Sequence, residues 1–234
     1  MISITLVIKS SLKKIIQKFI AKFFNSTYVR SNPFIWDDFE KRLSVLKEQK
    51  IDKNLFSVTI GVGSKIYEET IIHNASNNKS KISIGNGTHI RGELLVQKYG
   101  GSIKIGDNSF VGQGTRIWSG DTIEIGDNVL ISHNCNIIDT NSHEIDYKER
   151  AERSKELFIS GPWAKKGSVK TMPIIIEDDV WISFNVTILK GVRLGKGSII
   201  AANAVVTKDV PDFSLVVGNP GEVVKNINEQ TNSL

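Results

Sequence analysis

The chain has 234 residues, 40% of them hydrophobic and 24% charged, which is enough for one large domain with a buried core. Its single cysteine excludes an internal disulfide and favours a reducing compartment such as the cytoplasm. The net charge of +5 comes from the five lysines of residues 1–24, since the other 25 basic residues are balanced by 25 acidic residues. This distribution argues against a basic nucleic-acid-binding surface.

Residues 1–24 predict an amphipathic helix, because apolar residues recur at three- and four-residue steps and lysines take the other face. The lysines interrupt the apolar residues and no small-residue cleavage site follows, so we expect neither a signal peptide nor a membrane-spanning helix. Two interpretations remain open. The helix packs on the domain or on a neighbouring subunit, or it lies on an anionic membrane and places a cytoplasmic protein at the inner membrane face.

A second helix is predicted after the turn at Asn32 and Pro33, with Asp37 and Asp38 near its start. Together the two helices would form an N-terminal helical segment, residues 1–55.

The rest of the chain is a six-residue repeat in which the first residue is aliphatic. These first residues, including a weaker set at the start, are Ile60, Ile66, Ile72, Ile84, Ile90, Val96, Ile105, Val111, Ile117, Ile125, Ile131, Ile137, Ile176, Ile182, Ile188, Leu194, Ile200 and Val206. The fifth residue of most repeats is small or β-branched, and Gly, Asp and Asn gather between the two positions.

This pattern predicts a mainly β fold, a triangular prism of parallel strands. Each repeat supplies a short strand and a corner, the aliphatic first residue points inward, and three repeats make one coil. The corners need Gly or Asn because they take unusual backbone angles. We expect this domain to span residues 56–227, with a C-terminal tail of residues 228–234.

The repeat stops over residues 138–173 and then resumes. A long loop inside a regular domain is usually functional. This loop carries His143 within the sequence TNSHEIDYKER, and a neutral imidazole is a base suited to reactions near pH 7.

Three stretches resemble the hexapeptide-repeat acyltransferases, and most of all the sugar O-acetyltransferases that act on galactosides, maltose, nodulation factors and polysaccharides. The stretches are TNSHEIDYKER, which is similar to that family's Thr-x-x-His-x-x-Asp-x-x-x-Arg loop, VWISFNVTILKGVRLGKGSIIAANAVVTKDVP, and the closing VVGNPGEVVK. The resemblance covers roughly residues 58–227 and implies a left-handed parallel β-helix, a homotrimer with sites between subunits, acetyl-CoA as the acyl donor and no metal. The repeat spacing alone does not give the hand of the coil.

By this resemblance His143 is the catalytic residue, a general base that takes the proton from an acceptor hydroxyl as the hydroxyl attacks acetyl-CoA directly. Its orienting partner stays open among Asp139, Glu144, Asp146 and a backbone carbonyl.

The resemblance also implies a coenzyme site on the C-terminal repeats. The residues are Trp181 and Ala202 beside the pantetheine arm, Thr207 and Lys208 near the nucleotide end, Lys225 at the phosphates, and Ser183 next to Trp181 and Ile182. The chain departs from the galactoside enzymes at Glu222, which replaces an arginine and would repel phosphate, and at Phe184, which replaces a small residue.

The acceptor-binding candidates are Gln113, His133, Asp139 and Trp163. Gln113 lies next to Gly112, the position where galactoside enzymes place an asparagine. His133 either lines the acceptor cleft or is a surface residue. Trp163 belongs to an insertion, ISGPWAKKG, and either stacks on a sugar ring or holds the loop in place.

Three further residues receive structural interpretations. Cys135 occupies a small fifth position of its repeat, so we expect a core residue and not a nucleophile. His73 and His89 lie in early coils and are expected to have no catalytic function.

We therefore expect an acetyl-CoA-dependent O-acetyltransferase acting on a sugar hydroxyl of a surface polysaccharide or its precursor. The alternatives are an N-acetyltransferase on an amino-sugar nucleotide and a non-catalytic repeat scaffold, although a scaffold would lack the loop histidine and the coenzyme residues. A γ-class carbonic anhydrase shares the prism, but His133 and His143 lack the close His-x4-His spacing that its zinc site needs.

Overall fold

The computed structural model describes residues 34–161 and 165–228. Its internal contacts divide the chain into two units, residues 1–49 and 50–234. Helix α3, Phe34–Phe56, confirms the second predicted helix. The segment of residues 1–24, with its two interpretations, lies outside the described residues. Within the described ranges, no helix is both long enough and apolar enough to cross a bilayer.

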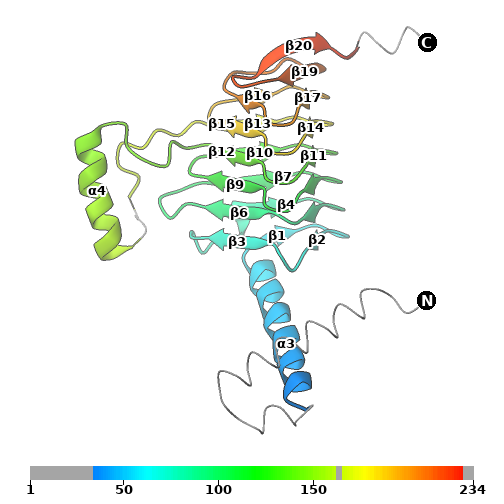
Figure 1. The fold of residues 1–234 in the computed structure, drawn as a ribbon, viewed down its shortest axis with the longest axis vertical. Helices are drawn as coiled ribbons and strands as arrows, with labels where there is room; N and C mark the ends of the chain where they lie inside the picture. The colour runs from blue at the N-terminus through cyan, green and yellow to red at the C-terminus, as the bar shows by residue number, and fades with distance from the viewer. Residues whose placement is uncertain (1–33, 162–164, 229–234) are drawn as a thin grey trace. The chain divides into compact units, whose positions relative to one another are not determined.

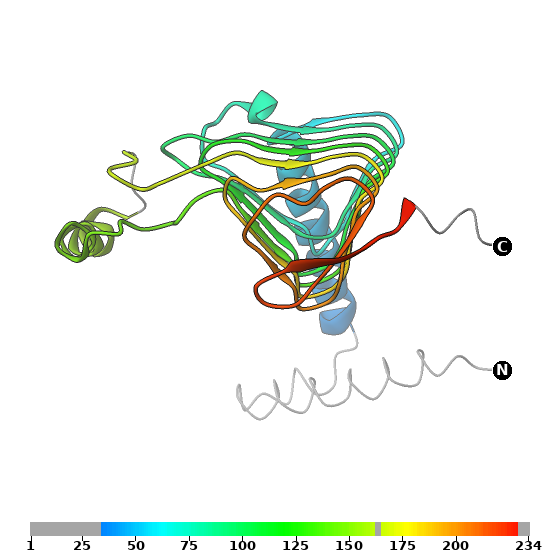
Figure 2. The same cartoon turned by 90° about the horizontal axis from the view of Figure 1, so that it is seen from above.

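The second unit is a three-walled prism of short strands, seen from the side in Figure 1 and from above, along its axis, in Figure 2. We name the walls sheets A, B and C in the order in which the chain visits them. Sheet A contains β1 Thr59–Ile60, β4 Ile82–Ile84, β7 Ile103–Ile105, β10 Ile123–Ile125, β13 Ile174–Ile176 and β16 Arg193–Leu194. Sheet B contains β2 Lys65–Ile66, β5 His89–Ile90, β8 Phe110–Val111, β11 Leu130–Ile131, β14 Trp181–Ile182, β17 Ile199–Ile200, β19 Ser214–Val217 and β20 Glu222–Asn226. Sheet C contains β3 Ile71–Asn74, β6 Glu93–Val96, β9 Arg116–Ser119, β12 Asn136–Ile138, β15 Thr187–Leu189 and β18 Val205–Val206, and a short 3-10 helix, Lys79–Lys81, precedes β4.

The core is a column of stacked aliphatic side chains, because successive coils pair in register. Ile123 of β10, for example, pairs with Ile103 of the preceding coil and with Ile174 of the next. The first residues of the repeats from Ile84 to Val206 are all buried, and so are most of the fifth-position residues. Each fully buried Ile, Leu or Val side chain contributes about 1.5–3 kcal/mol. The predicted prism of inward-pointing repeats is confirmed.

Asn, Asp or Gly residues with positive φ form two of the three corners. The corner between sheets A and B has Gly87, Asn108, Asn128, Asp179 and Gly197, and the corner between sheets B and C has Gly114, Asn134, Asn185 and Asn203. The left-handed backbone region disfavours most side chains and is tolerated best by Gly and Asn. The corner assignment is therefore confirmed. The third corner, between sheets C and A, varies in length from coil to coil.

The outer faces of the three walls differ in chemistry. Sheet A is mainly polar outside and presents Ser83, Lys104, Glu124, Ile175 and Arg193. Sheet B presents a register-matched apolar row of Phe110, Leu130, Trp181 and Ile199. Sheet C presents a second apolar row of Leu95, Trp118, Ile138 and Leu189. Two walls thus carry an apolar row on the outside, although sheet C also presents the polar Arg116 and Asn136 beside it. Exposed apolar rows are typical of surfaces that another molecule covers.

Candidate active site

The long loop leaves the prism at the corner between sheets C and A (Figure 2). Residues 139–173 separate β12 from β13, close to the predicted bounds. The two limbs are linked where they leave the wall. The N–H of Asn141 donates to the carbonyl of Lys170 at 2.9 Å, and the N–H of Met172 donates to the carbonyl of Asp139 at 3.0 Å. The loop therefore starts from a fixed base.

The loop contains a helix that is absent from the elements predicted from the sequence. Helix α4, Tyr147–Ser160, is capped by Asp146, whose carboxylate accepts from the N–H groups of Lys148 and Glu149, each at 2.9 Å. A capping aspartate is a signal for a helix start. The helix buries little, however, and Phe158 near its end is 85% exposed, so no apolar period marks it in the sequence.

His143 lies on the turn between the outgoing limb and α4, and its side chain is exposed. The hydroxyl oxygen of Thr140 accepts from the N–H of Ser142 at 3.0 Å, and Ser142 takes a left-handed conformation with φ of 64°. The guanidinium of Arg150 donates to the carbonyls of the two residues that follow His143, at 2.6 and 3.0 Å. These contacts explain the motif: Thr140 shapes the turn, Asp146 caps the helix and Arg150 holds the backbone beside His143.

Asp139 is completely buried, which corrects its assignment as an acceptor contact. Its carboxylate accepts from the hydroxyl of Ser119 at 2.6 Å and from the N–H groups of Gly120 at 2.7 Å and Asp121 at 3.0 Å. Burial raises the pKa of Asp139, and these three hydrogen bonds oppose the shift. The carboxylate therefore closes the corner from which the loop leaves and has no surface for an acceptor.

The two other carboxylates considered as orienting partners also have structural contacts. Glu144 is buried and forms an ion pair with Arg153 of α4. Asp146 is the N-cap of the same helix. All three acidic residues near His143 thus help to build the loop.

The coenzyme candidates lie on the C-terminal coils in three places. Trp181 on β14 is 48% exposed, and Ser183 and Ala202, both half-buried, follow at the corner between sheets B and C. The exposed Thr207 and Lys208 lie instead at the corner between sheets C and A, which also releases the loop. Lys225 is exposed on β20, which pairs antiparallel with β19 at the end of sheet B.

Gln113, His133, Phe184 and Ala202 form a column at the corner between sheets B and C. The carbonyls of Gln113, His133 and Phe184 each accept an N–H from the next coil at 3.1 Å. The imidazole of His133 stacks on the ring of Phe184, with centroids 5.3 Å apart and planes 8° apart. Each member is the third residue of its repeat, so the repeat register could have revealed the column. The family resemblance alone identifies Phe184 only as a departure from the galactoside enzymes.

Cys135 lies behind this column and is fully buried. Its thiol donates to the carbonyl of Ser183 at 3.0 Å, and burial raises the pKa of the thiol. Both findings agree with the predicted core role. Trp163 lies within residues 162–164, outside the described part of the chain.

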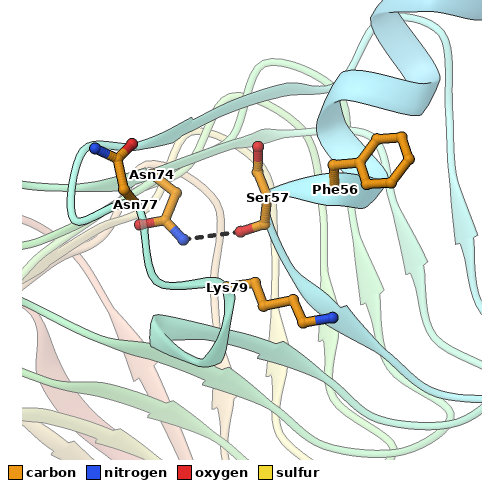
Figure 3. A pocket seen from close by; sticks show the side chains of 5 residues that line it. All are labelled: Phe56, Ser57, Asn74, Asn77 and Lys79. Carbon is orange, nitrogen blue, oxygen red and sulfur yellow. Dashed lines mark hydrogen bonds between the residues drawn. The ribbon is translucent and has the colours of Figure 1, made fainter.

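A separate cavity of about 270 Å³ lies at the N-terminal coil and is shown in Figure 3; Phe56, Ser57, Asn74, Asn77 and Lys79 line it. Inside it, the side-chain amide of Asn74 donates to the carbonyl of Ser57 at 2.8 Å. The coils of β6 and β9 separate this cavity from the coil that carries the loop. It is not part of the candidate active site.

Two family models match the prism. The model described as bacterial transferase hexapeptide (six repeats) matches residues 173–208, and the model described as hexapeptide repeat of succinyl-transferase matches residues 102–137.

Curated relatives match parts of the chain. A Saccharomyces cerevisiae protein provisionally named an acetyltransferase is 37% identical over 132 residues, 56% of this chain and 60% of its own length. A Mycobacterium tuberculosis protein, also provisionally named an acetyltransferase, is 32% identical over 147 residues, 63% of this chain and 45% of its own length. A Staphylococcus aureus 2,3,4,5-tetrahydropyridine-2,6-dicarboxylate N-acetyltransferase is 56% identical over 57 residues, 24% of each chain. The chain thus spans 60% or less of the length of each of these relatives.

Among solved structures, AntD, an N-acyltransferase from Bacillus cereus in complex with dTDP and 3-hydroxybutyryl-CoA, superposes with a TM-score of 0.59 at 22% identity. The match covers 79% of this chain and 93% of AntD, and it shows a shared fold. Together with the repeat matches it confirms the expected left-handed parallel β-helix. Two stretches of the chain, residues 102–137 and 173–208, thus match hexapeptide-repeat models, and the fold around them is shared with AntD.

Proposed function

We propose that this protein is an acetyl-CoA-dependent O-acetyltransferase acting on a sugar hydroxyl of a surface polysaccharide or its precursor. The observation that carries the proposal is the presentation of His143, an exposed imidazole on a turn that Thr140, Asp146 and Arg150 hold in shape. The transferase names of the repeat models and of the partly covered relatives agree with acyl transfer.

In this proposal His143 takes the proton of the acceptor hydroxyl at an imidazole nitrogen while the hydroxyl oxygen attacks the acetyl carbonyl. General-base catalysis of this kind contributes about 100- to 10,000-fold to a rate. Acetyl-CoA, when bound, supplies the acetyl group as an activated thioester. The residues around the turn keep the imidazole in one place, which is their contribution to the reaction.

The C-terminal coils offer surfaces suited to acetyl-CoA. The half-exposed indole of Trp181 can cover the apolar part of the pantetheine arm. The exposed ammonium groups of Lys208 and Lys225 suit phosphate. Glu222 shares β20 with Lys225 and would oppose phosphate there, so Lys208 is the stronger candidate for the nucleotide end.

We further propose that the enzyme is a homotrimer with its sites between subunits. His143 belongs to the loop that leaves at the corner between sheets C and A. Trp181 lies on sheet B, and the column that contains His133 and Ala202, called the His133 column, lies at the corner between sheets B and C. Sheets B and C each carry an apolar row on the outer face, as expected if neighbouring prisms cover these rows. A loop from one subunit could then meet the coenzyme surface of the next.

Acylation of an amine is a second candidate reaction. The observation that favours it is the 56% identical stretch of 57 residues shared with the Staphylococcus aureus N-acetyltransferase. An uncharged amine already has a free lone pair, so its dependence on a base differs from that of a hydroxyl only in degree.

Product chemistry distinguishes the two reactions. The full chain is incubated with acetyl-CoA and with matched acceptors. Sugar nucleotides and polysaccharide fragments offer hydroxyls, and amino-sugar nucleotides offer a free amine as well. Released CoA is measured and the product is treated with hydroxylamine, which cleaves an ester but not an amide. We expect a hydroxylamine-labile acetyl product. A stable product formed only from amine acceptors would contradict O-acetylation.

Replacing His143 tests the proposed base. His143→Ala should lower kcat by about two orders of magnitude or more, because the acceptor hydroxyl loses its proton acceptor. Acetyl-CoA binding, measured by calorimetry, should change little. The matched control is His73→Ala, which removes an exposed histidine from the first coil and should keep the wild-type rate. A His143→Ala enzyme within a few-fold of wild type would refute the assignment.

A further inference from the structure

A buried ion pair lies directly behind the His143 turn. Glu144 follows His143 in the chain, and its side chain has no exposed surface. The guanidinium of Arg153, from the second turn of α4, pairs with it and is 15% exposed. Glu144 occupies an unspecified position of the Thr-x-x-His-x-x-Asp-x-x-x-Arg motif, and Arg153 lies beyond it.

Arg153 also contacts the return limb of the loop. Its Nη2 donates to the carbonyl of Lys165 at 2.8 Å. Gly167 packs so closely on the guanidinium that a Cβ added there would lie 3.0 Å from the Cζ atom of Arg153. One side chain therefore links the His143 turn, helix α4 and the return limb.

The return limb is in turn fixed to the prism. The ammonium of Lys166 donates to the hydroxyl oxygen of Thr171 at 2.6 Å, and the Thr171 hydroxyl donates to the carboxylate of Asp121 at 2.9 Å. Asp121 lies between β9 and β10, so it belongs to the wall and not to the loop. A continuous set of contacts runs from the wall through the return limb and Arg153 to the residue after His143.

We propose that Glu144 and Arg153 are positioning residues for His143, an inference that rests on the proposed function. The pair holds the turn against α4 and the return limb, so that the imidazole is presented at one place. A buried charge that loses its partner has to reach water, and here that requires the turn to open. A displacement of about 1 Å in a catalytic group can lower a rate by about 100-fold.

The experiment compares charge-removing and charge-keeping substitutions in the full chain. Arg153→Met keeps an unbranched side chain but removes the charge, and it should lower kcat about 10- to 100-fold with the KM for acetyl-CoA unchanged. Arg153→Lys should recover part of that loss. The matched control is Lys155→Met, which breaks an exposed ion pair with Glu152 on the same helix and should change nothing.

Hydrogen exchange supplies a readout that does not depend on turnover. In Arg153→Met the amides of residues 140–146 should exchange faster, while the strands of the prism and the melting temperature stay as in wild type. Glu144→Gln should produce the same losses, and the double variant should lose little more than either single variant.

Several outcomes would overturn the inference. For Arg153→Met these outcomes are a wild-type kcat with unchanged hydrogen exchange, or general unfolding of the prism. An Arg153→Lys enzyme as slow as Arg153→Met would also overturn it, and so would additive losses of kcat in the double variant. A slow His143→Ala enzyme beside a normal Arg153→Met enzyme would refute positioning alone. A normal His143→Ala enzyme would refute the proposed base itself, and hydrogen exchange would still report whether the pair orders the turn.

Discussion

Asp139 closes the corner from which the long loop leaves, and three donors surround its carboxylate. One oxygen accepts from Gly120, and the other accepts from both Ser119 and Asp121. An amide in its place can offer only one oxygen. The residue after β12 is therefore specified as a carboxylate by donors from the preceding coil.

Asp139→Asn should lower the free energy of unfolding by about 1–3 kcal/mol at pH 7, because one buried donor loses its acceptor. Urea unfolding measures this loss. Asp52→Asn, at an exposed aspartate of α3, is the control and should be neutral. An Asp139→Asn protein as stable as wild type would show that the corner tolerates an amide.

The same pair of proteins tests the ionisation of Asp139. Burial raises its pKa above the 3.8 of a free side chain. Between the unfolded and the folded pKa the native state holds the proton more tightly, so the free energy of unfolding falls as pH rises through that window. The advantage of wild type over Asp139→Asn should therefore shrink as pH rises from about 4 and become constant above the folded pKa. A pH-independent difference would contradict a raised pKa.

At the scale of elements, some coil corners approach too closely for a side chain. A Cβ added at Gly106 would lie 2.2 Å from the Oδ1 atom of Asp127 and 2.6 Å from the carbonyl oxygen of Gly126. The same Asp127 atom accepts from the N–H of Asp107 at 2.6 Å. Stacking of adjacent coils, and not backbone angle, requires glycine at this position.

Gly106→Ala and Gly63→Ala separate these two reasons for glycine. Gly63 has φ of 74° and its nearest neighbours are 3.9 Å away, so alanine there costs only backbone strain, about 1–2 kcal/mol. Gly106→Ala should cost about 3 kcal/mol, because it separates paired coils. Chemical unfolding of both variants checks the order. Equal losses would mean that the coils can move apart freely.

At the scale of the whole molecule, two walls of the prism carry an apolar row outside and the third wall is mainly polar. Leu130 on sheet B is 53% exposed, Leu189 on sheet C is 42% exposed and Ile175 on sheet A is 41% exposed. The three side chains are similar in size and exposure but lie on different walls. They form a matched set for testing which walls are covered in an assembly.

Leu130→Asp and Leu189→Asp should shift the proposed trimer towards monomer, since a charge at a covered apolar surface loses its hydration. Ile175→Asp should leave the assembly intact. Light scattering after size exclusion measures the mass, and activity should fall together with assembly. Mixing His143→Ala subunits with Trp181→Ala subunits should restore some activity if each site uses two chains. A fully active wild-type monomer would refute the arrangement.

The sequence alone determined the core of the prism, because burial of every sixth residue and positive φ at the corner residues are local properties of one coil. It also located the loop and His143 through a short motif. It did not predict α4, whose residues are mostly exposed, or the role of Phe184, whose stacking partner His133 lies on the other side of the loop in sequence. Only the tertiary structure showed that Asp139 is buried, that Arg153 pairs with Glu144, and that the loop and the His133 column occupy different corners. These facts depend on contacts between distant coils, which the period of a repeat does not encode.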